Sequence, residues 1–324
     1  MRWRSIGLLS LLLALVVVTY YALESKSKSS GSRADRLFQA EEKDVEKITI
    51  TRGEELIVLQ RKGTLSAGQA GGWRLIEPVQ ARADATEVAS LLHTLLEAAE
   101  ERRIEETPAS LADYGLERPS MRLSLTLKGG QTLPALLLGD LNPNGRSVYA
   151  KRLDQPAVFL ATVIIRVRAD KKSDDFRDKT LLALEPNQVT QVELAGKGQP
   201  ISLSQVEGKG WEMSKPIKVR ADAAVIGRLL WKIKDARVTA FVDSGPDAKR
   251  KYGLERPDLI VALKDAGSSV KRLLLKKAAD SQVGLYAMAE PGEGVVTIDP
   301  DFLDSIPNGP DAFKQATPPA SSSP

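Results

Sequence analysis

The side chains that most often perform catalysis or bind metals are scarce in this chain of 324 residues. It has one histidine, His93, and no cysteine. A typical zinc site needs several nitrogen or sulfur ligands and a thiol nucleophile needs a cysteine, so the sequence argues against both. Phosphate-binding glycine loops and the common hydrolase and metalloprotease signatures are also absent. We therefore expect a non-enzymatic protein without a cofactor, in which His93 has a structural or surface role.

One acidic stretch has the spacing of a metal-binding loop. Asp140, Asn142, Asn144 and Gly145 match the opening of a calcium loop, but its last ligand position holds Lys151 instead of a bidentate glutamate. Asparagine, proline and glycine in such density favour a turn. The sequence therefore predicts a hairpin here and no metal.

Asp84 and Asp222 could be paired carboxylates for acid–base chemistry. Each, however, directly precedes a segment with the apolar periodicity of a helix, and aspartate is a preferred N-cap residue. Glu87, three positions after Asp84, could complete a capping box. We interpret both aspartates as helix caps.

Basic residues provide one candidate site for an anion. Lys271, Arg272, Lys276 and Lys277 flank three leucines in a run that is typical of a strand. Such a strand could contact an anionic envelope polymer or lipid headgroups. Its lysines could equally protect the edge of a sheet. The formal net charge of +4 is too small to argue for a nucleic-acid partner.

An internal repeat organises the chain. The segment 114–119, Tyr-Gly-Leu-Glu-Arg-Pro, recurs unchanged at 252–257, and the same offset aligns other matching residues. The repeat signature consists of Trp73, Pro78, Asp84, Tyr114, Gly115, Leu116 and Pro119, with their counterparts Trp211, Pro216, Asp222, Tyr252, Gly253, Leu254 and Pro257. Arg82 and Arg220 also recur, and we expect structural ion pairs there and core positions for the tryptophans. The duplication predicts two copies of one fold.

Each copy has the periodicity of a sheet with one helix. Apolar residues alternate with polar ones from Met121 to Leu127, as in a half-buried strand, and residues 84–99 carry a continuous apolar helical stripe. Gly115 suits the left-handed end of a helical turn, which would direct Leu116 into the core. We predict an α+β fold with two tandem repeats, each a mainly antiparallel sheet with one long amphipathic helix.

The chain begins with an uncharged apolar stretch. Residues 5–23 would span roughly 28 Å as a helix, close to the thickness of a bilayer core. We expect an uncleaved single-pass anchor, with a cleaved signal peptide as the alternative. The predicted divisions are the anchor 1–23, a flexible linker 24–43, the first repeat 44–160, a connector 161–186, the second repeat 187–304 and a disordered tail 305–324.

The signature residues resemble a bacterial family, the domain-of-unknown-function 4340 family, over about residues 44–304. The tryptophan and proline elements, the Ala-Asp helix starts and the two Tyr-Gly-Leu segments carry the resemblance, together with Phe176-Arg177-Asp178-Lys179. The resemblance implies a bacterial envelope protein. Arg2 and Arg4 favour a cytoplasmic N-terminus, so we expect the globular part on the periplasmic side of the inner membrane. The resemblance also implies an accessory role beside ABC transporters of the gliding-motility type, and it transfers no catalytic residues.

Three functions follow as hypotheses. The first is a non-enzymatic accessory or scaffolding protein that contacts transporter subunits or other envelope proteins. The second is a binding module for an anionic envelope polymer, through Lys271, Arg272, Lys276 and Lys277. The third is a hydrolase of unfamiliar design, which requires a pocket with clustered carboxylates.

Overall fold

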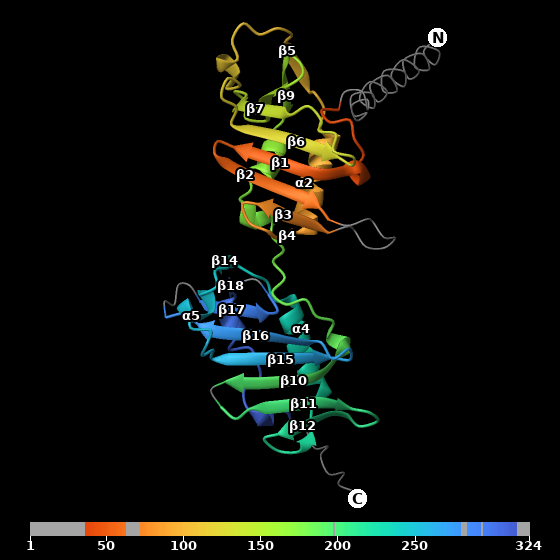
Figure 1. Ribbon diagram of the computed structural model, residues 1–324, viewed down its shortest axis with the longest axis vertical. Helices are drawn as coiled ribbons and strands as arrows, with labels where there is room; N and C mark the ends of the chain where they lie inside the picture. Colours follow the sequence, from red (N-terminus) through yellow and green to blue (C-terminus); the bar gives the residue numbers. More distant parts are fainter. Residues whose placement is uncertain (1–35, 63–71, 197, 280–283, 293, 316–324) are drawn as a thin grey trace, which may run out of the picture. The chain divides into compact units, whose positions relative to one another are not determined.

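The computed structural model describes residues 36–62, 72–196, 198–279, 284–292 and 294–315. The chain divides into two compact units, residues 1–178 and 179–324 (Figure 1). The predicted anchor, residues 1–23, lies outside the described residues. Within the described part, no helix has both the length and the apolar character that a membrane crossing requires.

The first unit is built on an antiparallel sheet of nine strands, in the order β4-β3-β2-β1-β6-β7-β8-β9-β5. The strands are β1 Val45–Arg52, β2 Glu55–Arg61, β3 Trp73–Glu77, β4 Ala81–Arg82, β5 Arg102–Glu105, β6 Met121–Leu127, β7 Leu136–Leu141, β8 Ser147–Arg152 and β9 Val158–Thr162. Strand β1 is central and pairs with both β2 and β6.

The second unit repeats this topology, in the order β13-β12-β11-β10-β15-β16-β17-β18-β14. The strands are β10 Val189–Gly196, β11 Ile201–Val206, β12 Gly210–Lys215, β13 Val219–Arg220, β14 Ala240–Asp243, β15 Leu259–Asp265, β16 Val270–Lys277, β17 Leu285–Glu290 and β18 Val295–Ile298. The register repeats as well, since Ile50 faces Leu123 in one sheet and Leu194 faces Val261 in the other. The predicted duplication of an α+β fold is therefore confirmed.

One long helix covers one face of each sheet. Helices α2 (Ala85–Glu97) and α4 (Ala223–Asp235) lie behind the strands in Figure 1. Alternating apolar side chains of the strands meet the apolar stripe of the helix, and the resulting core excludes water. The buried helix residues are Val88, Leu91, Leu92, Leu95 and Leu96 in α2, and Ile226, Leu229, Leu230 and Ile233 in α4.

The predicted N-caps are confirmed, but the capping box is not. The Asp84 carboxylate accepts hydrogen bonds from the backbone N–H groups of Thr86 and Glu87. A capping box would need the Glu87 side chain to accept from the Asp84 N–H. That N–H instead donates to the Phe176 carbonyl at 2.8 Å, and the Glu87 carboxylate pairs with Lys171.

The C-terminal segment of each unit closes the start of its helix. Phe176 ends the 3-10 helix η4 (Ser173–Phe176), is fully buried, and accepts the bond from Asp84. Phe313 ends η7 (Pro310–Phe313), is equally buried, and accepts the same bond from Asp222 at 2.8 Å. Residues 161–178 and 299–315 are thus equivalent parts of the two units.

Three of the predicted segment boundaries differ from those in the structure. The connector 161–186 is not a separate segment, because Phe176 belongs to the first core and Leu181 to the second. The predicted disordered tail includes Ile306 and Phe313, which are buried in the second core. The predicted linker ends earlier than residue 43, because Phe38 is buried in the first core. In all three, a few apolar residues within polar sequence mark the packed positions.

The Tyr-Gly-Leu segments lie on the opposite face of each sheet from the long helix. Leu254 packs with Leu274 in a small separate cluster, whereas the neighbours Leu273 and Leu275 point into the main core. Side chains alternate across a strand, so Leu254 covers the second face. The prediction of a buried leucine was made for Leu116, which is 2% exposed. The prediction of a left-handed glycine is confirmed by a φ of 67° at Gly115.

Candidate functional site

The basic strand β16 lies inside the second sheet and not at its edge. It pairs with β15 on one side and β17 on the other. Its lysines therefore do not protect a sheet edge, and that interpretation is wrong. Successive side chains of a strand point to opposite faces of the sheet, so the four cations cannot all lie on one face. Lys271 and Lys277 share a face with Leu273, whereas Arg272 and Lys276 lie on the other face.

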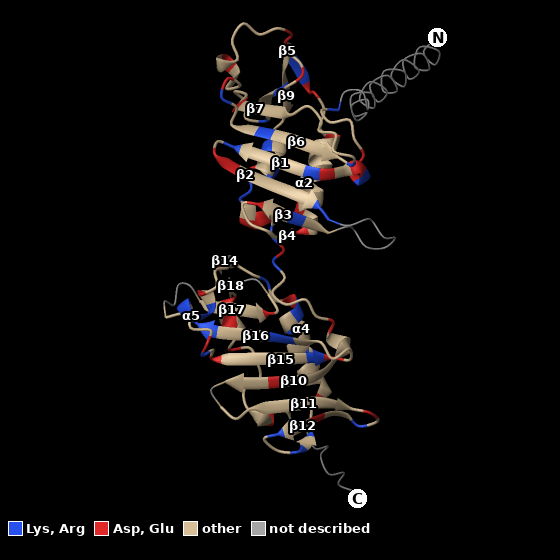
Figure 2. Ribbon diagram, in the orientation of Figure 1, with Lys and Arg blue, Asp and Glu red and all other residues tan. Residues whose placement is uncertain are grey.

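Most of these cations are engaged within the unit. The Lys276 ammonium lies 3.1 Å from Asp258 Oδ1, and the Lys277 ammonium lies 2.9 Å from Asp304 Oδ1. Lys271 donates to the carbonyl of Ala183 at 2.5 Å. Figure 2 shows blue and red segments interspersed along this sheet. The predicted cationic surface is therefore largely neutralised by local partners.

The signature tyrosines perform the same packing in both units. The rings of Tyr114 and Tyr149 have centroids 5.1 Å apart, at 59° to one another. The rings of Tyr252 and Tyr286 repeat this contact at 5.0 Å and 58°. Tilted ring pairs of this kind stabilise a fold beyond the area they bury. The repeated signature therefore holds the Tyr-Gly-Leu segment against the sheet.

The other signature residues also have structural surroundings. Trp73 is buried in the first core, where the Arg61 guanidinium carbon lies 4.9 Å from its ring centroid, and Trp211 packs partly buried against the second core. Arg82 pairs with Asp178 at 2.9 Å, and Arg220 donates to the Lys209 carbonyl at 3.3 Å. The peptide bonds before Pro78 and Pro216 are both cis. Pro119 and Pro257 each lie two residues before the first residue of a strand, β6 or β15.

The residues first considered for catalysis or metals do not converge. His93 is exposed on α2. Asn142 accepts a hydrogen bond from the Ser147 N–H at 3.1 Å and thereby closes the β7–β8 hairpin, as predicted. Within the described ranges, no group of three or more histidine, aspartate or glutamate side chains is arranged to hold a metal ion.

The tyrosine pairs differ between units in their carboxylate partner. In the first unit the Tyr114 hydroxyl donates to Glu105 at 2.8 Å, and this hydrogen bond raises the pKa of Tyr114. The equivalent carboxylate of the second unit is Asp243. It accepts from the Gly245 N–H and from the Lys251 ammonium, which together lower the pKa of Asp243.

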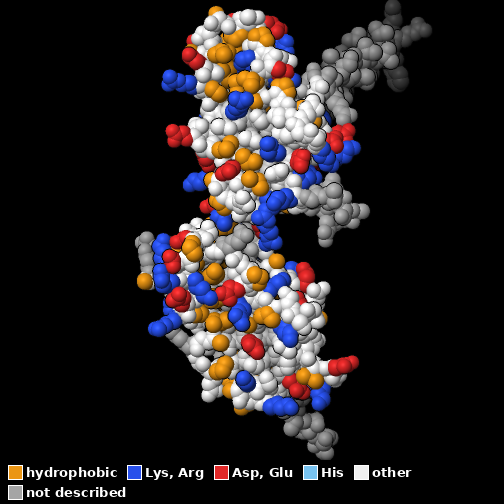
Figure 3. Space-filling model, viewed as in Figure 1, with side chains coloured by type: hydrophobic (Ala, Val, Ile, Leu, Met, Phe, Trp, Pro, Cys, Tyr) orange, Lys and Arg blue, Asp and Glu red, His pale blue; other side chains and the backbone are white. Residues whose placement is uncertain are grey.

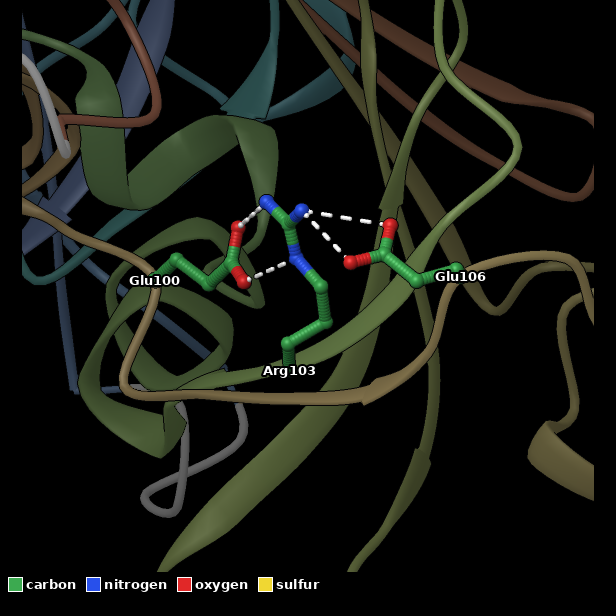
Figure 4. Close-up of polar contacts among 3 residues, drawn as sticks. All are labelled: Glu100, Arg103 and Glu106. Atoms are coloured by element: carbon green, nitrogen blue, oxygen red, sulfur yellow. Dashed lines mark hydrogen bonds and ion pairs between the residues drawn. The ribbon is translucent and has the colours of Figure 1, made fainter.

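An exposed arginine of the first unit, Arg103, pairs with two carboxylates. The Arg103 guanidinium lies between the carboxylates of Glu100 and Glu106, with its closest bonds at 2.7 Å and 3.0 Å (Figure 4). These bonds raise the pKa of Arg103 further above its ordinary value. The position equivalent to Arg103 is Phe241, so this group is not part of the repeat. Such exposed pairs contribute little to stability.

One recess among the described residues of the second unit lies at the end of strands β10, β11 and β15. It has a volume of about 470 Å³, which is within the range of small-ligand sites. Apolar walls come from Leu194, Ile201, Leu259, Leu303, Ile306 and Pro307. Polar groups come from Gln199, Asp258, Lys277, Asp304 and Asn308. We call this recess the strand-end pocket.

An ion-pair group fills the same place in the first unit. Arg52, at the end of β1, donates to Asp170 Oδ1 at 2.8 Å and to the Lys171 carbonyl at 2.8 Å. It also pairs with Glu55 at 2.9 Å. The Arg52 side chain is only 14% exposed. Arg52 therefore ties the end of β1 to residues 170 and 171.

The register of the sheets identifies the replacements in the second unit. Gly196 stands at the position of Arg52, because Ile50 and Leu194 are equivalent and each lies two residues earlier. Gln199 replaces Glu55, Pro307 replaces Asp170 and Asn308 replaces Lys171. All four replacements line the strand-end pocket. The second unit has thus lost every charged side chain of this group.

The family-model comparison gives two matches to the model described as Domain of unknown function (DUF4340), over residues 73–223 and 211–318. Together they cover most of the chain and both copies of the signature. The chain belongs to this family. The comparisons with curated proteins and with solved structures gave no match.

The DUF4340 matches and the folding units have different boundaries. Both matches begin at the signature tryptophans, Trp73 in β3 and Trp211 in β12. The units instead divide between residues 178 and 179. The first match therefore ends with β10 to β13 of the next unit and excludes β1 and β2 of its own. Because β1 is central in its sheet, the unit that folds cannot begin at β3.

The sequence did not reveal the strand-end pocket. The fourteen signature residues are those that both copies share, and shared residues proved structural. The pocket lies where the copies differ, at Arg52 and Gly196. Aligning the two opening hairpins position by position would have exposed this difference.

Proposed function

We propose that this DUF4340 protein is a non-enzymatic, membrane-anchored envelope protein that acts through contacts with other proteins. The observation that supports this most is that, among the described residues, part of the second face of each sheet carries no long helix. In the second unit this face has a groove of about 410 Å³ lined by Ile260, Ala262, Val270, Arg272 and neighbouring residues of β10. Figure 3 shows hydrophobic side chains among charged ones on this side.

The composition of this face suits a protein partner. Val270 is 48% exposed, and Arg272 and Glu193 supply charges of both signs. Protein interfaces combine apolar contacts with arginine and a polar rim. The family resemblance supports an accessory role beside an ABC-type transporter in the bacterial inner membrane. Residues 5–23 support the anchor, with the units on the periplasmic side.

Affinity purification from native membranes tests this proposal. The tagged full-length protein is solubilised gently and its co-purified proteins are identified by mass spectrometry, with a chain lacking residues 1–23 as the control. Enrichment of permease and ATPase subunits with the full-length protein is the expected result. A Val270→Asp variant, changed at the exposed groove, should lose those subunits. A Val167→Asp variant should retain them; Val167 is 58% exposed on helix α3 (Val163–Ala169). Recovery without any transporter subunit contradicts the transporter role.

The alternative role is a binding module for an anionic envelope polymer. Lys276 and Lys277 already have carboxylate partners, so Arg272 is the most informative position to test. If the polymer binds this strand, Arg272→Glu should weaken binding to purified anionic envelope polymer in vitro. Unchanged binding, or none in the unmodified protein, rules out this role for β16.

A further inference from the structure

The groove on the second face of the second sheet has walls of opposite charge. Ala262 of β15 pairs with Glu193 of β10 on one side and with Arg272 of β16 on the other (Figure 1). All three lie on the second face, since a neighbour of each in its own strand is buried in the main core. Ala262 is therefore the floor of the groove, and Glu193 and Arg272 form its walls.

Neither wall residue has a partner within the chain. Glu193 and Arg272 are both exposed, and among the described residues neither side chain takes part in a hydrogen bond or ion pair. Their backbones are two strand spacings apart, roughly 10 Å, with only the methyl group of Ala262 between them. Arg272 differs in this from Lys276 and Lys277, whose ammonium groups already have carboxylates. The groove thus holds two unused charges of opposite sign.

Charges arranged in this way are complementary to a second copy of the same surface. When two such sheets pack face to face about a two-fold axis that runs along β15, β10 of one copy lies opposite β16 of the other. Each Glu193 then faces Arg272 of the second copy, and Ala262 faces its own counterpart on the axis. An axis that runs across the strands brings Glu193 against Glu193 instead. The axis along β15 is therefore the one that pairs opposite charges.

The rest of the face suits this packing. Strand β15 is the middle strand of its sheet, with four strands on either side, so the two faces match in width. Ile260 and Val270, which is 48% exposed, lie beside the charged row and add apolar contact. The Tyr-Gly-Leu segment packs on Leu274, on the β16 side, so the rotation places it over the β10 side of the second copy. Lys264 lies near the axis, and its flexible stem carries the ammonium to the rim, where water screens its repulsion.

We propose that the second unit associates with a second copy of this chain through the face of β10, β15 and β16, with two reciprocal ion pairs between Glu193 and Arg272. The equivalent positions of the first unit hold uncharged residues, namely Thr49, Ser124 and Ala135. This inference rests on the proposed role in protein contacts and names the partner that the groove takes. A transporter then contacts the dimer, and Val270→Asp releases it by separating the two copies.

Charge reversal tests the reciprocal pairs in the purified full-length protein. Self-association is measured by analytical ultracentrifugation in a mild detergent. Glu193→Arg and Arg272→Glu should each raise the dissociation constant of the dimer at least about tenfold, because each variant places like charges opposite one another at both pairs. Single variants that associate as tightly as the unmodified protein overturn the proposal.

Two rescues separate the pairing from a general effect of charge. An equimolar mixture of Glu193→Arg and Arg272→Glu should regain the unmodified affinity, because the arginines of one copy then face the glutamates of the other. The double variant with both changes should regain it as well. Residues 1–23 are the same in every variant, so association through them cannot produce this pattern. A mixture that binds no more tightly than either variant alone overturns the proposal.

A cysteine on the axis locates the contact. The chain has no cysteine, so Ala262→Cys places a single thiol in each copy. Facing sheets lie about 10 Å apart, a span that a short bis-maleimide can bridge. The matched control is Ser124→Cys, at the equivalent position of the first unit. We expect a cross-linked dimer from Ala262→Cys and none from Ser124→Cys. Equal yields from the two variants, or no dimer from Ala262→Cys, overturn the proposed face.

Failure of this test and failure of the proposed function are distinguishable. Self-association is measured on the purified chain, so it is independent of the transporter purification. A dimer without co-purified transporter subunits retains the groove contact and rejects the transporter role. Transporter subunits recovered with a chain that does not self-associate retain the role and reject the second copy as the occupant of the groove.

Discussion

The two units of this protein share their topology but differ in individual side chains, which can be found by comparing equivalent positions of the two copies. Both close the start of the long helix with a buried phenylalanine, Phe176 or Phe313, and both pair two tyrosines across the second face of the sheet. They differ at Arg52, whose bonds to Asp170 and Glu55 have no counterpart at Gly196. What is repeated maintains the fold, and what is not repeated is the better place to look for function.

The largest expected effect is on the folding of separately produced fragments, which depends on where each fragment begins. Residues 36–178 and 179–324, produced separately, should each fold cooperatively, because each contains its own core. Residues 73–178 and 211–324, which begin where the family matches begin, should remain unfolded because they lack the central strand β1 or β10. Circular dichroism during thermal unfolding measures this. A cooperative transition in the shorter pieces would mean that the central hairpin is dispensable.

The next effect tests whether the terminal segments are equivalent. Phe176→Ala in the first isolated unit and Phe313→Ala in the second should each lower the free energy of unfolding by about 3–5 kcal/mol, the usual loss for a buried aromatic ring. Urea denaturation of each unit gives the values. A large loss in one unit and a small loss in the other would show that only one segment holds its helix.

A smaller effect is expected at the position that distinguishes the units. Arg52→Ala removes a mostly buried guanidinium from Asp170 and the Lys171 carbonyl and should lower the free energy of unfolding of the first unit by about 1–3 kcal/mol. Urea denaturation of the isolated first unit measures the loss, and a variant as stable as the unmodified unit would contradict the contribution of these bonds.

The smallest expected effect is a difference between the units in how their stability depends on pH. The pKa of Tyr114 is raised by its hydrogen bond to Glu105, so that contribution to stability is present below the ordinary value of 10.0 and is lost as the pH rises through the folded pKa. The pKa of Asp243 is lowered, first by the Gly245 N–H and then by Lys251, so its contribution is present above 3.8 and is lost as the pH falls through the folded pKa.

Two titrations check these directions. Tyrosinate absorbance of the first unit, compared with a Tyr114→Phe variant, should show one tyrosine ionising above its ordinary range, and Glu105→Gln should lower that pKa. Carboxyl carbon NMR of the second unit should place Asp243 below 3.8, with a rise in Lys251→Ala. A Tyr114 pKa at or below 10.0 would contradict the hydrogen bond to Glu105.

The periodicity of the sequence predicted many of the helices and strands, but it did not predict where each folding unit ends. The alternation in Met121–Leu127 and the stripe from Val88 to Leu96 each belong to one element, so a local pattern is sufficient to find them. The packing of Phe176 and Phe313 depends on contacts with a helix start roughly ninety residues earlier, at Asp84 and Asp222. Single apolar residues in polar surroundings give no periodic signal, and both were therefore assigned to a connector and a tail.

The candidate site was less predictable than the fold. Four basic residues in one strand indicated an anion site, but the charges that neutralise Lys276 and Lys277 come from Asp258 and Asp304, which are distant in sequence. The strand-end pocket is lined by Gly196, Gln199, Pro307 and Asn308, which differ from their counterparts in the first unit, and composition does not locate such differences. Only the comparison of two equivalent positions makes it visible.

The separate closure of the two units has an evolutionary consequence. Because each unit supplies the last segment that seals its own core, a mutation that weakens one copy leaves the packing of the other intact. After the duplication, one copy could therefore keep a stabilising interior group while the other drifted and was selected for recognition. Relatives with the same duplication should vary more at the strand-end positions of one copy than of the other, and that asymmetry would identify the copy under selection for binding.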